Sequence, residues 1–483
     1  MKINQLEPLI LWDYFEQITR IPRPSKHEEK MIAYLQQFAS AHHLDFTTDS
    51  AGNVVIRKAA CIGYESEKKI ILQAHMDMVC EKNSDTIFDF ENQAIQAYID
   101  GDFVKAKGTT LGADNGIGMA MMLALLSDNN LAHPALECLF TADEETGLTG
   151  AFALDKQLLK GEVLINLDSE DDGEIFIGCA GGMDTTATMH YIEEDSPENY
   201  FAFQLKVSGL KGGHSGDDIH RGLANANKVL NRYLWNLNQI TDLRLHAISG
   251  GNLRNAIARE AQAIASVPWS EKENVRVQLN HFIHDVTLEY ASTEPNLQIT
   301  LESEIMPAKS IDKKTSTNLL HALYACAHGV GAMSVEMPGM VETSTNLASV
   351  KMMPNHSIVI TTSQRSAVNS SKYDIAHQVA SVFLLAGCTV AHGDGYPGWK
   401  PNVQSDILKI AEKTHADLFS KRANVRSIHA GLECGLFLEK YPHLDMISIG
   451  PQMYGVHSPE ERLSISSTQR CWKWLLAILA HKH

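Results

Sequence analysis

Three strand-like segments end in side chains that could bind a metal ion or move a proton. The run "IILQA" leads into His75 and Asp77, whose side chains point the same way because a strand alternates its faces. "LECLFTA" leads into the tandem acids Glu144 and Glu145, and "VLIN" leads into Asp168. In an open parallel α/β sheet, ligands gather at the carboxyl ends of the strands. We therefore expect these five side chains to meet at one edge of a sheet.

A further carboxylate, Asp114, lies in the glycine-rich turn "TTLGADNGIG" just before a helix-like run. Taken alone, Asp114 would be typical of a helix cap. Four carboxylate-bearing segments and a histidine on one edge would repel each other severely without a cation. Histidine and carboxylate ligands suit Zn²⁺, with Mn²⁺ or Co²⁺ as substitutes. The pattern predicts that His75 binds metal and that the Asp77 carboxylate, without binding the metal itself, fixes the orientation of the His75 ring.

The tandem acids Glu144 and Glu145 point to opposite sides if extended, or differ by about 100° if helical. One of them can bind metal while its neighbour faces the attacking water, where a carboxylate is a natural general base. The chain contains no His-Glu-x-x-His, Gly-x-Ser-x-Gly or Walker A run, which disfavours the zincin, serine-hydrolase and P-loop chemistries. The residues therefore predict metal-assisted hydrolysis.

Helix-like and strand-like segments alternate over the first part of the chain, and these segments must position the residues described above. "PLILWDYFEQI" and "KHEEKMIAYLQQFASAHH" read as amphipathic helices, and we expect Ser25 and Glu28 to form a capping box for the second. "GNVVIRK", "LECLFTA" and "EVLINLD" read as buried strands. "LDMISIG" and "STQRCWKWLLAILAHK" repeat the strand and helix pattern near the end of the chain. Alternating strands and helices predict a mostly parallel α/β sheet with helices on it.

A central stretch has a different character. "FAFQLKVSG", "LQITLESEI" and "HSIVITTSQ" alternate like half-exposed antiparallel strands. Two glycine-rich segments, "GCAGGMD" and "HGDGYPG", bracket the stretch and suit hinges. We predict an inserted α+β domain over residues 185–395, within a first domain made of residues 1–184 and 396–483.

Composition narrows the classes of function. The 483 residues are 44% hydrophobic and 20% charged, which is ordinary for a folded protein. The formal net charge of −17 argues against nucleic acid or an anionic membrane as a partner. Eight scattered cysteines without a Cys-x-x-Cys pair indicate reduced thiols. The N-terminus does not read as a signal peptide, and the apolar run "CWKWLLAILA" is too short to span a bilayer, so we expect a cytoplasmic protein.

The motifs together resemble the M20 metallopeptidases, and within them the bacterial aminoacyl-histidine dipeptidases. The resemblance covers nearly the whole chain and implies a zinc-exopeptidase type of catalytic domain with an inserted lid. It is carried by "LQAHMDMV", "GTTLGADNGIGMA", "TADEETGLTGAF", "INLDSEDDGEIFIGCAGG", "GLKGGHSGDDIHRGLANANK", "LRNAIARE", "GYPGW", "IHAGLECGLF" and "SIGPQMYGVHSPEE".

This resemblance implies a pair of Zn²⁺ ions and hydrolysis of dipeptides, preferentially Xaa-His peptides such as β-alanyl-histidine. A water activated by the metals attacks the peptide carbonyl, and no covalent intermediate is needed. The implied roles are a bridging ligand at Asp114, one site completed by His75 and Asp168, a second completed by Glu145 and His457, support of His75 by Asp77, and a general base at Glu144. His457 rests on the resemblance alone, since by itself it would be an ordinary loop histidine.

The inserted domain is expected to act as a lid that supplies substrate contacts. His214, in "GLKGGHSGDD", would donate a hydrogen bond to the developing oxyanion. Arg365, at the end of "HSIVITTSQR", would pair with the substrate carboxylate through its planar fork. Asn255, in "LRNAIARE", is a further candidate for binding the substrate. The resemblance also favours a homodimer formed through the lid, with His214 acting either within its chain or across the dimer.

Two other functions compete with a dipeptidase. A tripeptidase or an N-acyl amino acid deacylase would share the architecture, although "HAGLECGLF" and "GLKGGHSG" favour the dipeptidase. A non-catalytic metal-binding protein built on the same fold would be expected to lack Glu144 or Asp114, and both residues are present.

Overall fold

Residues 2–482 are described by a computed structural model, which divides into two compact units. The first unit contains the residues up to Gly178 together with Pro401–Ser427 and the residues from Leu432 onward. The second unit contains Cys179–Lys400 and the short return segment Ile428–Gly431. All eight cysteines are free thiols. No helix among the described residues is both long enough and apolar enough to cross a membrane.

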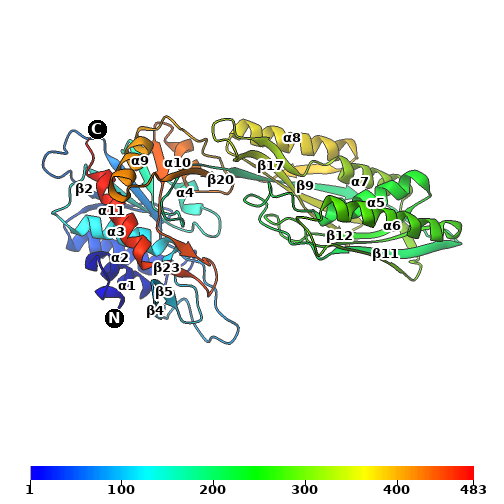
Figure 1. Cartoon of the computed structure of the whole chain (residues 1–483), viewed down its shortest axis with the longest axis horizontal. Coiled ribbons are helices and arrows are strands. Elements are labelled where there is room, and N and C mark those ends of the chain that lie inside the picture. Colours follow the sequence, from blue (N-terminus) through cyan, green and yellow to red (C-terminus); the bar gives the residue numbers. More distant parts are fainter. Residues whose placement is uncertain (1, 483) are drawn as a thin grey trace. The chain divides into compact units, whose positions relative to one another are not determined.

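The first unit is built on a sheet of eight strands within the described residues (Figure 1). The spatial order is β1 (Asp45–Thr48), β2 (Val54–Lys58), β6 (Leu136–Thr141), β3 (Ile70–His75), β7 (Val163–Asn166), β21 (Asp445–Ser448), β8 (Glu174–Cys179) and β20 (Asn424–Ile428). Neighbouring strands β6, β3, β7 and β21 pair in parallel, whereas β1 with β2, β2 with β6, and β8 with β21 pair antiparallel.

Helices flank this sheet, which confirms the predicted mixed α/β class. Helix α3 (Ala113–Ser127) is almost wholly buried because its sequence, "GIGMAMMLALLS", is apolar on every side. It packs against β3 and against helix α1 (Leu9–Thr19). A small second sheet has the order β22 (Met453–Tyr454), β23 (Arg462–Ser464), β5 (Phe103–Ala106) and β4 (Ala97–Asp100). The helices of the unit are α1 (Leu9–Thr19), α2 (Glu29–Ala41), α3 (Ala113–Ser127), α4 (Thr149–Ala153), α9 (Asp406–Phe419), α10 (Cys434–Lys440) and α11 (Ile465–Leu479), with a short 3₁₀ turn at Ile3–Gln5.

The predicted capping box at the start of α2 is wrong. Ser25 Oγ instead donates to Asp77 Oδ2 at 2.8 Å, and Glu28 Oε1 accepts the backbone N–H groups of Lys26 and Asp143 at 3.0 and 2.9 Å. Each side chain therefore bonds to a segment distant in sequence, and Glu28 also bonds to its neighbour Lys26. Long-range contacts outweigh the local capping preference here.

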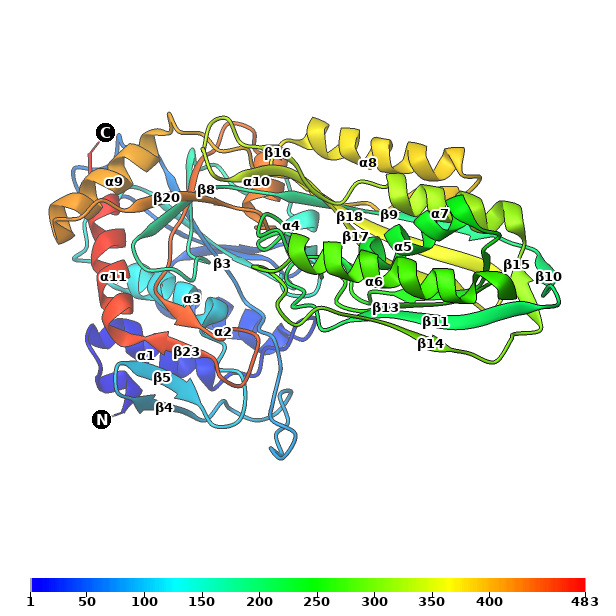
Figure 2. The same ribbon diagram turned by 45° about the vertical axis from the view of Figure 1, so that its right-hand side comes forward.

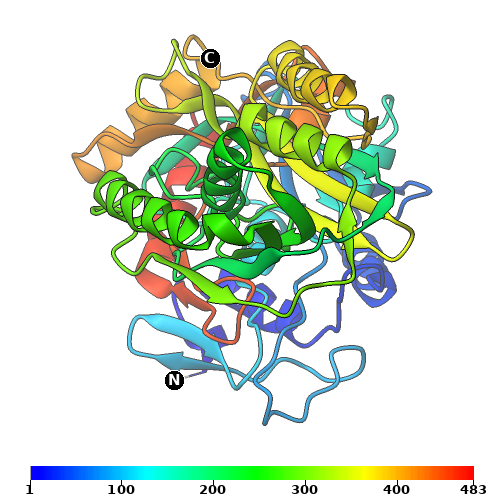
Figure 3. The same cartoon turned by 90° about the vertical axis from the view of Figure 1, so that its right-hand side faces the viewer.

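The second unit is dominated by an antiparallel sheet covered by four helices, α5 (Ala226–Ile240), α6 (Lys272–Glu289), α7 (Lys313–Ala325) and α8 (Asn369–Leu385). Figures 2 and 3 show these helices side by side. The strand order is β14 (Gln298–Ser303), β11 (Tyr200–Ser208), β13 (Ala261–Pro268), β12 (Arg244–Gly250), β17 (Val341–Met353), β18 (Ser357–Ser366), β9 (Gly181–His190) and β19 (Thr389–His392), with β16 (Gly329–Met333) on β17. Strands β10 (Glu193–Asp195) and β15 (Lys309–Ile311) pair separately, and a 3₁₀ turn spans Trp269–Glu271.

The sheet of the second unit contains the same arrangement twice. In chain order, β11, α5, β12, β13, α6 and β14 form one half, and β9, α7, β17, β18, α8 and β19 form the other. The spatial orders, β14-β11-β13-β12 and β19-β9-β18-β17, correspond strand by strand. The halves join where β12 pairs with β17 through Ser249–Lys351 and Gly250–Val350. The first half is inserted into the second, between β9 and α7.

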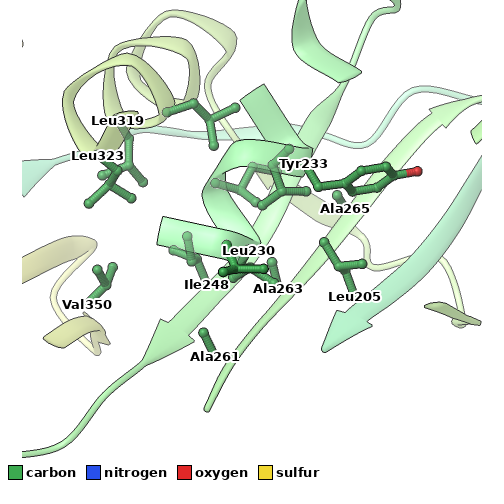
Figure 4. Packing of buried hydrophobic residues seen from close by; sticks show 14 of the residues in the cluster. Leu205, Leu230, Tyr233, Ile248, Ala261, Ala263, Ala265, Leu319, Leu323 and Val350 are labelled. Carbon is green, nitrogen blue, oxygen red and sulfur yellow. The ribbon is translucent and has the colours of Figure 1, made fainter. Parts of the chain in front are cut away.

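One continuous hydrophobic core supports the second unit. Figure 4 shows part of it, with Leu230 and Tyr233 of α5 near Leu205 of β11. Leu319 and Leu323 of α7 belong to the same core, which contains residues from both halves of the sheet. Loops that leave this sheet are therefore anchored on a rigid base.

Candidate metal centre and active site

The carboxyl ends of three neighbouring parallel strands carry the predicted cluster of the first unit. His75 is the last residue of β3, Glu144 and Glu145 follow β6, and Asp168 follows β7. Asp114 joins them from the first turn of α3. The expected gathering at one edge is therefore what the strand pairing produces, because β6, β3 and β7 are parallel neighbours.

The two oxygens of Asp114 face two different histidines. Asp114 Oδ1 lies 2.9 Å from His75 Nε2, and Asp114 Oδ2 lies 3.2 Å from His457 Nε2. Asp168 Oδ1 adds a second carboxylate 3.3 Å from His75 Nε2, and Glu145 Oε2 lies 3.1 Å from His457 Nε2. Two His–carboxylate pairs thus share one carboxylate between them.

This donor set fits divalent cations. His75, Asp114 and Glu145 each offer a ligand atom within 4.8 Å of the others. Glu145 Oε1 is buried and has no hydrogen-bond partner among residues 2–482. In the protein alone, hydrogen bonds to Asp114 and Glu145 raise the pKa of His457 to about 11. The cluster attracts positive charge, and metal ions can replace the histidine protons because only a neutral imidazole is a ligand.

Asp77 supports more than its predicted partner. Its Oδ1 lies 3.3 Å from His75 Nδ1, but the same carboxylate accepts the backbone N–H groups of Glu144 and Glu145 at 2.9 and 3.1 Å. Although burial acts to raise it, the hydrogen bonds from His75, Glu144 and Ser25 lower the pKa of Asp77 to about 2. One buried anion therefore orients both the imidazole and the tandem glutamates.

Glu144 has the environment expected of a proton carrier. Burial, together with the carboxylates of Asp168, Glu433 and Glu145, raises its pKa well above the usual range, while His75 acts in the opposite direction. A carboxyl with a raised pKa can hold a proton for part of a reaction cycle and release it again.

Arg23 was not predicted, yet it ties two parts of the site together. The side chain is 1% exposed, and Nη1 donates to the carbonyl oxygens of Met76 and Asp77 at 2.8 and 2.6 Å. Its other amino group donates to the carbonyl of Gly112, in the turn that carries Asp114. Its partners are backbone groups, so residue types and spacing could not reveal them; the two prolines of "IPRPS" were the only local signal of a rigid turn.

Glu461 holds the same turn through its backbone N–H groups. One carboxylate oxygen accepts the N–H groups of Leu111 and Gly112 at 2.6 and 3.0 Å, and the other accepts those of Ala113 and Asp114 at 2.7 and 3.4 Å. Glu461 lies in the same loop as His457, within the quoted motif "YGVHSPEE". Together with Arg23, Glu461 therefore fixes the backbone from which Asp114 extends.

We expect Glu461→Gln to weaken metal binding about 10- to 100-fold, because outer residues that orient ligands have effects of this size. The amide nitrogen of glutamine would face backbone N–H groups and disturb the turn. Chelator-competition titration measures the change. The matched control is Glu460→Gln, since Glu460 is the exposed neighbour and should leave the affinity as it is.

A layer of buried polar side chains lies just beneath the cluster. Gln73 is opposite Asn166, and Asn166 is opposite Ser448, in the pairing of β3, β7 and β21. Glu433 Oε2 accepts from Gln73 Nε2 at 2.6 Å and from Thr141 Oγ1 at 2.8 Å. Burial raises the pKa of Glu433 to about 8. The motif "HAGLECG" contained Glu433, but its role becomes visible only when the strands are assembled.

The candidate substrate residues of the second unit also lie together. Arg365 Nη2 is 3.5 Å from His214 Nε2, and the N–H of Ser215 donates to the carbonyl of Asn255 at 2.8 Å. His214 Nδ1 accepts the backbone N–H groups of Gly216 and Asp217 at 3.3 and 3.1 Å. When the ring is neutral, its proton is therefore on Nε2, the nitrogen that lies 3.5 Å from Arg365 Nη2.

Comparison with known proteins places the chain in a family. A model of peptidase family M20/M25/M40 matches residues 71–481, and the chain belongs to this family. The resemblance inferred from the motifs is confirmed.

Two relatives match along almost their whole length at more than 40% sequence identity. The cytosol non-specific dipeptidase of Escherichia coli is 43% identical over 478 residues, which cover 99% of this chain and 98% of the relative. The crystal structure of aminoacylhistidine dipeptidase from Vibrio alginolyticus superposes with a TM-score of 0.95 at 41% identity, covering 100% of this chain and 98% of that one. A tripeptidase from Staphylococcus aureus, with a TM-score of 0.57 at 17% identity over 98% of both chains, shares the fold.

Proposed function

We propose that this metallo-dipeptidase binds two zinc ions and hydrolyses dipeptides, with a preference for Xaa-His peptides such as β-alanyl-histidine. The observation that carries the proposal is the position of Asp114, whose two oxygens face His75 and His457 at 2.9 and 3.2 Å. Asp168 would complete the first metal site and Glu145 the second. Mn²⁺ and Co²⁺ are expected to substitute for Zn²⁺, because the donors are imidazoles and carboxylates.

The chemistry supplied by the bound metals is to lower the pKa of water and to polarise the peptide carbonyl. Glu144 accepts a proton from the attacking water and then passes it to the leaving amine, for which its raised pKa is suited. Asp77 keeps Glu144 and His75 in place through the hydrogen bonds described above. His214 donates from Nε2 to the oxygen that becomes negative in the transition state.

A panel of substrates assayed on purified, metal-loaded protein tests the proposal. The panel contains β-alanyl-histidine, other dipeptides, tripeptides and N-acyl amino acids, each with Zn²⁺, Mn²⁺ and Co²⁺. Faster turnover of tripeptides or acylated amino acids would replace the dipeptidase proposal by one of the alternatives. No turnover with any metal, or no bound metal, would support the non-catalytic alternative.

Arg365 is proposed to bind the free carboxylate of the dipeptide. We expect Arg365→Met to raise KM strongly for dipeptides and to abolish discrimination against dipeptide amides, because a bidentate charged contact is lost. Initial rates on each dipeptide and its amide measure both effects. Arg254→Met is the matched control, since that side chain is 75% exposed and pairs with Asp184. Retained discrimination in the Arg365 variant would assign the carboxylate to another residue.

His214→Ala is expected to lower kcat about 10²- to 10³-fold, the usual effect of removing one oxyanion donor. His220→Ala, at an exposed position of the same loop, is the control and should retain activity. Steady-state kinetics at saturating substrate measures kcat directly. A fully active His214→Ala protein would remove this loop from the mechanism.

The second unit is further proposed to act as a lid and to form a homodimer, which sedimentation analysis tests. Mixing inactive Glu144→Gln and His214→Ala proteins then shows whether His214 acts across the dimer. Recovery of activity would mean that mixed dimers contain one working site. If subunits exchange and no activity returns, His214 works within its own chain.

A further inference from the structure

A buried histidine in the second unit has half of its hydrogen-bonding capacity unused. His429 lies in the short return segment Ile428–Gly431 and is 8% exposed. Its Nε2 lies 2.7 Å from Ser344 Oγ, whereas its buried Nδ1 has no hydrogen-bond partner anywhere in residues 2–482. Buried polar atoms of folded proteins are nearly always paired, so an unpaired ring nitrogen points to a missing ligand.

The bond to Ser344 indicates which nitrogen carries the proton. If the Ser344 hydroxyl donates to His429 Nε2, the hydroxyl is satisfied and the ring carries N–H at Nδ1. If Nε2 donated instead, the hydroxyl proton and the Nδ1 lone pair would both be left unpaired. The first arrangement leaves fewer groups unsatisfied. His429 therefore presents an N–H donor at Nδ1.

Two neighbouring residues also have unused polar atoms. Arg365 is 8% exposed, and its Nε is likewise buried without a partner in the described part of the chain. The hydroxyl of Ser215 is also buried and unpaired among those residues, and a Cβ on its neighbour Gly216 would lie 2.0 Å from the carbonyl oxygen of His429. Burial, with the charge of Arg365 acting in the same direction, lowers the pKa of His429 to about 3.

The ligand chemistry follows from these donors. Arg365 is the register partner of Ser344 in the β17–β18 pair, and Ser344 holds His429, so the guanidinium and the neutral N–H donor are neighbours. Such a pair of donors suits an anion with two acceptor oxygens in a plane. The carboxylate of Asp217 lies 3.3 Å from His214 Nδ1, and among the described residues it does not bond to His429 Nδ1 or to Arg365 Nε. A neutral imidazole can donate to an anion without adding a second buried positive charge beside Arg365.

We propose that His429, held by Ser344, donates from Nδ1 to the free α-carboxylate of the dipeptide and shares this anion with Arg365. The proposal rests on the dipeptidase function and makes His429 a specificity-determining residue. The substrate class it selects is peptides with an unmodified C-terminal carboxylate.

Two conservative variants separate this role from a structural one. The amide nitrogen of Asn can occupy the place of His Nδ1, whereas the amide of Gln reaches the place of Nε2 and meets Ser344. We expect His429→Gln to raise KM for β-alanyl-histidine about 10- to 150-fold with little change in kcat, the range for a lost hydrogen bond to a charged group. We expect His429→Asn to stay closer to the unmodified protein.

The comparison is made on the dipeptide and its C-terminal amide with metal-loaded protein. In His429→Gln the preference for the free carboxylate should fall by the same factor as the rise in KM. Ser344→Ala should lower this preference by a smaller factor. It removes the hydrogen bond that keeps the proton of His429 on Nδ1, but the imidazole ring itself remains. Thermal unfolding of each variant reports whether the fold is retained.

Unchanged preference in a folded His429→Gln protein would overturn the proposal. The proposal would also be overturned if His429→Gln kept the normal KM and carboxylate preference while His429→Asn lost them. That result would mean that the contact with Ser344, and not the donor at Nδ1, is what substrate binding requires. If the unmodified protein hydrolyses the dipeptide and its amide equally well, carboxylate recognition by Arg365 fails as well. Activity on dipeptides with normal discrimination, but no effect at His429, would leave the proposed function intact and reject only this inference.

Discussion

Glu144→Gln protein should retain its fold and its metals while losing about 10²- to 10⁴-fold in kcat, the range for removing a general base. Glutamine has nearly the same shape as glutamate but cannot accept the proton of the attacking water. The backbone N–H of residue 144 still donates to Asp77, so the local structure should persist. Steady-state kinetics on β-alanyl-histidine and metal analysis of the same sample measure the two properties together.

The neighbouring substitution provides the contrast. Glu145→Gln removes a charged oxygen that lies 3.1 Å from His457 Nε2, so this protein should lose metal as well as activity. Excess metal should then restore part of the activity of the Glu145 variant and none of that of the Glu144 variant. A near-normal kcat for Glu144→Gln would show that another group accepts the proton.

Asp114→Asn is expected to abolish most metal binding, and with it nearly all activity. Asp114 is the carboxylate shared by His75 and His457, so its loss affects both proposed metal sites at once. The asparagine amide can direct only one oxygen to the cluster and carries no charge. Elemental analysis after dialysis measures the metal content, and thermal unfolding with and without Zn²⁺ measures the stabilisation that bound metal contributes.

Asp100→Asn is the control for charge alone, because Asp100 is a largely exposed carboxylate in the same unit. That variant should bind metal normally and show the usual rise in melting temperature. If Asp114→Asn also bound its full complement of metal, the bridging role would be wrong. The ligands would then have to be sought among the remaining carboxylates.

The part of the site that sequence could predict is the part that strand ends determine. A buried strand of known direction brings His75, Glu145 and Asp168 to one edge, because neighbouring parallel strands end together. The change from buried to alternating strands is the signal from which an inserted domain over residues 185–395 is predicted. Ser25 shows the limit of such patterns, since its local sequence suggests a helix cap and its actual partner is Asp77.

The remaining residues depend on contacts that spacing does not encode. His457 follows from family motifs and not from any interval along the chain. Arg23 and Glu461 act on backbone carbonyl and N–H groups, which every residue possesses, so their partners could be found only in three dimensions. Glu433 and His429 belong to one motif, yet they fall in different compact units, a division that the motif itself does not reveal.

The position of β21 constrains how the protein is made. This strand lies between β7 and β8, although the whole of the second unit is encoded before it. While the ribosome synthesises that unit, β7 and β8 are without the strand that joins them, and their open edges can pair with other chains. His457 and Glu461 leave the ribosome later still. The proposed metal centre is therefore completed only after the second unit has been synthesised, and chains that stop before β21 carry an unfinished sheet that is prone to aggregation.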